Sequence, residues 1–87
     1  MRIDKYLKVA RILKRRVVGK ELAESERLFI NGRSAKAASE VKPGDEVLIV
    51  FGHREIRIRI LEVRMNASKQ EALGMYEIIE EKNESGL

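Results

Sequence analysis

Residues 1–20, MRIDKYLKVARILKRRVVGK, interleave apolar and basic residues at the spacing of an α-helix. On a helical projection, Lys5, Lys8 and Arg11 fall on the side opposite one apolar stripe. The stripe consists of Ile3, Tyr6, Leu7, Ala10 and Leu13. The pattern predicts a helix that buries its apolar side and presents an ordered set of cations to the solvent.

Two helices are expected in this segment. Asp4 suits the positive end of a helix dipole, so we predict a first helix over residues 3–10. A second helix, from residue 15 or 16 to residue 24, would pack across the first and direct Val18 and Leu22 inward. The cations of both helices would then lie on one rigid frame.

The remainder of the chain predicts turns and strands. Asn31-Gly32 tolerates the positive φ of a tight turn, and Pro43-Gly44 marks a second turn. The predicted strands are residues 27–30, 46–51, 56–60 and 75–81, with one helical turn over 69–73. Together these elements predict an α+β fold with two N-terminal helices packed on a small antiparallel sheet.

The third of these strands has one buried face. Ile56, Ile58 and Ile60 alternate with arginines, which is the period of a sheet with one face in the core. Leu61 and Val63 have the opposite phase, so a bulge or strong bend is expected near Ile60.

Composition excludes several classes of protein. The chain has 87 residues, a net charge of +4 and no cysteine, which supports one small domain without disulfides or thiolate metal sites. Glu21, Glu24, Glu26 and His53 form no catalytic constellation, so we expect neither an enzyme nor a metal or cofactor. The charged N-terminus is neither a signal peptide nor a membrane span, and the cytoplasm is the expected location.

The charge pattern favours binding of a polyphosphate. Up to residue 20 only Asp4 could pair with the cations, and its helical neighbour is Lys8. The candidate RNA-binding residues are Arg2, Lys5, Lys8, Arg11, Lys14, Arg15, Arg16, Lys20, Arg33 and Lys36. The alternatives are an ordinary solvated helix face and docking to a membrane or an acidic protein.

The order of several short motifs resembles a known RNA-binding domain. The motifs are MRIDKYL at residues 1–7, Arg16 at the start of a helix, Ile30-Asn31-Gly32, Lys36, and VKPGD at 41–45. This pattern is similar to the domain first named from ribosomal small-subunit protein S four. The segments after Phe51 resemble the small bacterial RqcP family, which is related to the fifteen-kilodalton heat-shock protein.

The resemblance implies a fold, a function and a set of contacts. It implies an S-four-type domain over residues 1–64, with residues 65–87 as an extension that packs on it and ends in an acidic tail. RqcP-like proteins bind large ribosomal subunits obstructed by peptidyl-tRNA, contact rRNA and tRNA, and support alanine tailing by RqcH. Arg2 and Arg16 would lead the RNA backbone contacts, Lys36 would complete the patch, and the protein is expected to be a monomer. Because exposed cations contribute little to stability, removing both arginines is expected to leave folding nearly unchanged.

Two other functions stay open on the sequence. The first is a general rRNA or tRNA binder acting in ribosome assembly or heat-shock rescue. The second is a protein adaptor that uses the acidic end, although those residues also suit a plain solvated tail. The acidic residues are Glu77, Glu80, Glu81 and Glu84. Arg57 and Arg59 would form either a second contact surface or an ordinary charged sheet face.

Two positions depart from the S-four-type pattern. Glu26 stands where that family commonly has glycine, and a left-handed cap there would cost Glu roughly 1 kcal/mol. Gly19 stands where that family usually has a small residue, often alanine, and a small residue here keeps the two helices close. Tyr6 could stack on a base, but its place in the apolar stripe favours the core.

Overall fold

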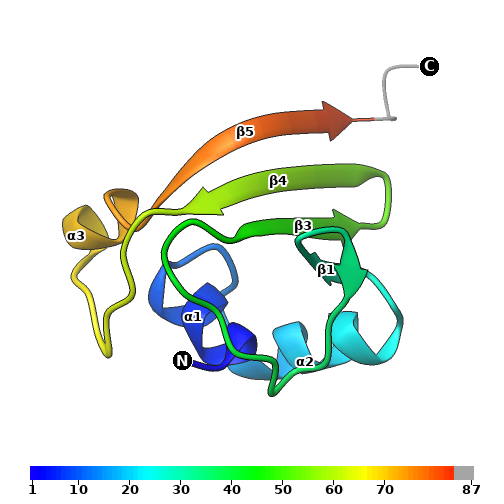
Figure 1. The fold of residues 1–87 in the computed structure, drawn as a ribbon, viewed down its shortest axis with the longest axis horizontal. Coiled ribbons are helices and arrows are strands. Elements are labelled where there is room, and N and C mark those ends of the chain that lie inside the picture. The colour runs from blue at the N-terminus through cyan, green and yellow to red at the C-terminus, as the bar shows by residue number, and fades with distance from the viewer. Residues whose placement is uncertain (84–87) are drawn as a thin grey trace.

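The computed structural model describes residues 1–83 and has the predicted α+β fold. Within these residues, three short helices and five strands follow one another (Figure 1). They are α1 (Ile3–Val9), α2 (Arg16–Glu24), β1 (Leu28–Ile30), β2 (Arg33–Ser34), β3 (Glu46–Phe51), β4 (Arg54–Ile60), α3 (Lys69–Leu73) and β5 (Tyr76–Asn83). No helix in this part of the chain is long and apolar enough to cross a membrane.

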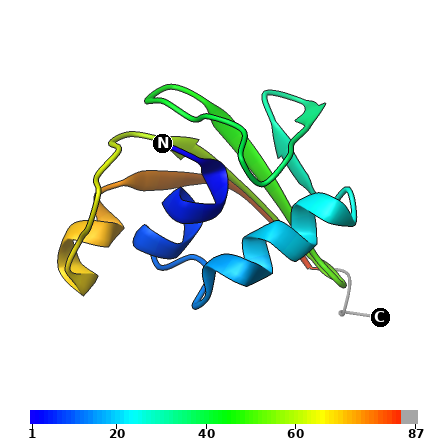
Figure 2. The ribbon, with the colours of Figure 1, turned by 90° about the horizontal axis from the view of Figure 1, so that it is seen from below.

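The five strands form one antiparallel sheet in the order β2-β1-β3-β4-β5. Helices α1 and α2 lie together on one face of this sheet, and α3 lies beyond its end beside α1 (Figure 2). Because β5 pairs along the whole of β4, residues that follow the loop after β4 belong to the same sheet as the N-terminal strands. A domain boundary at residue 64 stays a prediction.

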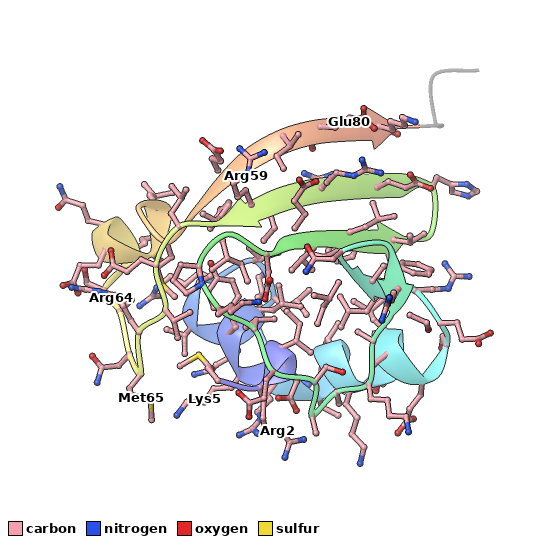
Figure 3. The ribbon with its side chains drawn as sticks, viewed as in Figure 1. Arg2, Lys5, Arg59, Arg64, Met65 and Glu80 are labelled. Atoms are coloured by element: carbon pink, nitrogen blue, oxygen red, sulfur yellow. The ribbon has the colours of Figure 1, made fainter. Side chains whose placement is uncertain are left out.

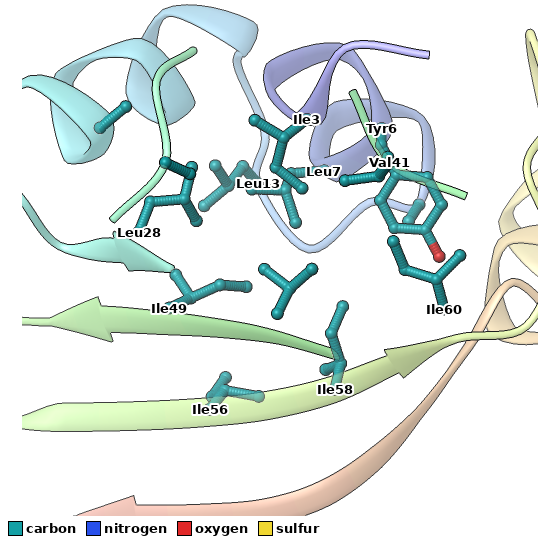
Figure 4. Close-up of a cluster of buried hydrophobic side chains, with 14 of the residues drawn as sticks. Ile3, Tyr6, Leu7, Leu13, Leu28, Val41, Ile49, Ile56, Ile58 and Ile60 are labelled. Carbon is teal, nitrogen blue, oxygen red and sulfur yellow. The ribbon is translucent and has the colours of Figure 1, made fainter. Parts of the chain in front are cut away.

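The core lies between the helix pair and the inner face of the sheet (Figure 4). The whole predicted stripe of the first helical segment is buried, and Tyr6 therefore lies in the core rather than on the surface. The same buried cluster includes Val47 and Ile49 of β3 and the isoleucines of β4. Each fully buried aliphatic side chain of this kind contributes about 1.5–3 kcal/mol to folding.

Several element boundaries differ from the sequence expectation. Helix α1 ends at Val9 because Arg11 adopts a left-handed backbone, with φ of 60°. Strand β2 was not predicted, since two residues are too short for any periodicity. The register shift lies between β4 and β5 at Arg57 and Ile58, not near Ile60, and Leu61 changes phase simply because β4 ends before it.

The second helix buries less of its predicted face than expected. Val18 and Leu22 are only half-buried against the core, whereas Gly19 and Ala23 are buried. A Cβ atom on Gly19 would lie 3.2 Å from the Cα atom of Asp4, so this glycine allows α2 to approach α1 closely. Glu26 has a φ of 56°, and the left-handed cap expected at this position is present.

Candidate nucleic-acid interface

Asp4 forms the centre of the basic N-terminal surface. Its carboxylate is almost fully buried, at 3% exposure, although it lies near the start of a surface helix. Arg2 donates from Nε and Nη2 to the two carboxylate oxygens at 3.2 and 3.1 Å. Arg16 approaches from α2 and places its Nε 3.2 Å from Oδ2. One carboxylate therefore joins two arginines that come from the starts of two different helices.

The ion pair at Asp4 differs from the one that the sequence suggested. Asp4 forms its ion pairs with Arg2 and Arg16 and not with its helical neighbour Lys8. The close approach at Gly19 brings the start of α2 within reach of Asp4. Both arginine side chains remain 46% exposed, so each can still meet an anion from the solvent.

A groove of about 560 Å³ runs beside this cluster. Five of the predicted RNA-binding residues line it, together with apolar side chains and a loop from the second half of the chain. The predicted residues are Lys5, Lys8, Arg11, Lys14 and Arg16. Arg2 lies on the same side of the molecule as Lys5 and Met65 (Figure 3). A concave, cation-lined surface of this kind suits a nucleic-acid backbone.

One segment that lines the groove was not predicted from the sequence. Met65, Asn66 and Ala67 form it, and these residues belong to the loop between β4 and α3. Arg11 donates from Nη2 to the carbonyl oxygen of Ala67 at 3.3 Å, which fastens this loop to the turn after α1. The segment has no periodicity that would place it there, so only tertiary structure reveals its position.

The other predicted residues lie outside the groove. Arg15, Lys20, Arg33 and Lys36 are exposed, and none of them lines it. The segment after Lys36 lies along the start of α1, because Asp4 donates its backbone N–H to Ala37 and Ile3 donates to Ser39. Arg33 lies on β2, at the edge of the sheet. Whether these four residues contact RNA stays a prediction.

The Asn31-Gly32 turn is fixed by a buried acid. Asn31 donates from Nδ2 to Oδ1 of Asp45 at 3.1 Å and accepts from the backbone N–H of Glu46. Burial raises the pKa of Asp45, but the hydrogen bonds from Asn31 and Lys42 outweigh it and hold that pKa below its usual value. Asn31 is thus structural, as its φ of 51° also requires.

The outer face of the sheet carries mostly paired charges. Arg59 forms ion pairs with Glu77 at 2.6 Å and with Glu46 at 3.7 Å, and Arg54 pairs with Glu81. Figure 3 shows Arg59 beside β5, far from Arg2 and Lys5. Glu77 and Glu81 of β5 are therefore paired with arginines of β4, Glu80 pairs with Lys82 of β5 itself, and Glu84 lies outside the described residues. Within residues 1–83, no cluster of acidic or histidine side chains could hold a metal ion.

Comparison with known proteins supplies the family. The S4 domain model matches residues 1–47, more than half of the chain. A Bacillus subtilis protein named RQC P-site tRNA stabilizing factor is 46% identical over 94% of this chain and 95% of its own length. The chain belongs to this family.

Further comparisons agree with membership of the stabilizing factor family. The Streptococcus pneumoniae member is 48% identical over 93% of this chain and 92% of its own length. A solved structure of Vibrio cholerae Heat Shock Protein 15, described as trimeric, is 29% identical with a TM-score of 0.82, and the match covers 90% of this chain and 80% of that one. The expected class, a non-enzymatic RNA-binding factor of ribosome quality control with an S4 domain, is confirmed.

Proposed function

We propose that this chain binds the large ribosomal subunit and steadies a P-site tRNA through the groove beside α1. The observation that carries the proposal is the convergence of five cations on one concave surface. The name of the relatives, RQC P-site tRNA stabilizing factor, supports the same ligand. A positively charged groove attracts the phosphates of RNA whatever the base sequence. A factor that recognises RNA by its shape requires this kind of affinity.

The finer parts of the proposal concern partners and location. The chain would act in the cytoplasm as a monomer and support alanine tailing by RqcH on subunits that carry a stalled peptidyl-tRNA. Because the heat-shock relative is described as trimeric, light scattering of the free protein should decide the oligomeric state. The adaptor function is less well supported, since Glu77, Glu80 and Glu81 each already pair with a basic residue of β4 or β5.

Co-sedimentation with purified large subunits, with and without peptidyl-tRNA, tests this function. The variant should be Lys8→Ala with Lys14→Ala, because both lysines line the groove and neither pairs with Asp4. The matched control is Lys69→Ala with Lys82→Ala, which removes the same charge from α3 and β5. If the two groove lysines each meet a phosphate, the slope of log affinity against log salt should fall by about 0.7–0.9 for each.

The outcomes separate the candidate functions. Binding that strengthens with peptidyl-tRNA and weakens only in the groove variant supports the stabilizing role. Binding that ignores the tRNA favours a general rRNA binder. Absence of binding at low salt excludes both.

A further inference from the structure

One exposed apolar side chain lies in the groove, where charged residues would be expected. Met65 is 69% exposed and lies beside Lys5, whose Nζ atom is 4.0 Å from its sulfur (Figure 3). Val9 and Leu13 contribute further apolar surface to the same groove. The groove can therefore contact more than phosphates, because it combines cations with apolar surface.

The loop that carries Met65 is held at both ends. Arg64 forms ion pairs with Glu62 and Glu71, which connects the loop to α3. Ser68 and Glu71 form a capping box at the start of α3, so the chain direction after the loop is fixed as well. A side chain presented by a braced loop loses less conformational freedom when it meets a ligand.

An unpaired nucleotide has the chemistry that this groove would recognise. Its base offers an apolar face, which Met65 can cover, and a polar edge, which the amide of Asn66 can meet as donor and acceptor. Its flanking phosphates would lie within the ring of lysines and arginines. Paired A-form RNA hides the faces of its bases, so it would use only the cations.

We propose that the groove holds one unpaired nucleotide of RNA, with its base against Met65 and its edge at Asn66. The inference rests on the proposed function and makes it more specific. It also assigns a role to residues beyond the 1–47 segment that the S4 domain model matches. The S4 portion provides the charges, and the loop after β4 provides the contact with the base.

The test uses two RNA duplexes and fluorescence anisotropy. One duplex carries a single bulged adenosine, and the other is identical except that this adenosine is paired. Adenosine is chosen because an asparagine amide can pair with the adenine edge. We expect the wild-type protein to bind the bulged duplex more tightly than the paired one.

Two variants and one control isolate the base contact. Met65→Ser should weaken binding of the bulged duplex about fivefold, or roughly 1 kcal/mol, and leave binding of the paired duplex unchanged. Asn66→Ala should act in the same direction. Leu73→Ser is the control, since Leu73 is 71% exposed on α3 and does not line the groove.

The two proposals fail in different ways. Equal wild-type affinity for both duplexes, or equal weakening of both by Met65→Ser, overturns the nucleotide site while salt-dependent RNA binding stands. If neither duplex binds at low salt, the RNA-binding function itself fails. Circular dichroism of each variant verifies that the fold is intact.

Discussion

Replacing Arg2 and Arg16 together by alanine should destabilise the fold, although both side chains lie at the surface. Asp4 is 3% exposed in the wild type, and the substitution removes both arginine partners of its carboxylate while keeping the backbone N–H of Lys5, which donates to Oδ1 at 2.7 Å. Removing the partners of a buried charge costs about 3–5 kcal/mol. Because the two guanidinium groups are half-exposed and water can enter where they lay, we expect about 3 kcal/mol, at the lower end of that range.

A second substitution tests the cause of this loss. Adding Asp4→Asn to the double variant removes the buried charge and should restore about 2 kcal/mol, since a neutral amide is far less costly to bury than a carboxylate. The free energy of unfolding is measured by urea titration with circular dichroism. The control, Lys8→Ala with Lys14→Ala, removes the same formal charge and should change stability by about 0.5 kcal/mol or less at each site.

Two results would refute the reasoning about Asp4. The first is a double arginine variant that loses less than about 1 kcal/mol, as the sequence alone suggested for exposed cations. The second is a triple variant that is less stable than the double variant, which would show that the charge of Asp4 is not the source of the loss. The first result would make Arg2 and Arg16 ordinary solvent-exposed cations, and the second would assign their contribution to contacts other than the ion pair with Asp4.

Two further predictions concern the contacts that join α1 and α3 to the rest of the molecule. Tyr6→Phe should cost about 1–2 kcal/mol, because the buried carbonyl oxygen of Met75 loses the 2.7 Å bond from the Tyr6 hydroxyl; urea unfolding measures the loss, and an unchanged midpoint would contradict it. The backbone of Ser68 and the guanidinium of Arg64 lower the pKa of Glu71 from 4.5 to about 2, so this acid stabilises the fold above pH 4.5 and loses that effect as the pH falls toward 2. Thermal unfolding of the wild type and Glu71→Gln over this range should therefore converge at low pH, and a constant difference would exclude the ion pair as the cause.

Much of the fold could be predicted because its signals are local. The apolar stripe of α1 follows the helical period, and Ile56, Ile58 and Ile60 follow the period of a strand. Asn31 marks its turn because few residues accept a positive φ. Each of these inferences needs only neighbours within a few positions, and each agrees with the structure.

The parts that escaped prediction depend on contacts between distant residues. The partner of Asp4 from the second helix, Arg16, becomes close only after α2 packs on α1, so the helical spacing suggested Lys8 instead. The loop at residues 65–67 reaches the groove only because β4 and α3 place it there. Strand β2 is defined by its pairing with β1 rather than by any pattern of its own.

The hydrogen bond from Tyr6 to Met75 shows that the segment recognised by sequence and the unit that folds are not the same part of the chain. A sequence comparison recognises residues 1–47 as a unit. The side chains that cover its apolar stripe include Ile56, Ile58 and Ile60, which lie outside it. The segment that matches the S4 domain therefore depends on residues outside it to keep its apolar stripe away from water. Substitutions in the stripe and in β4 would have to compensate for one another during evolution.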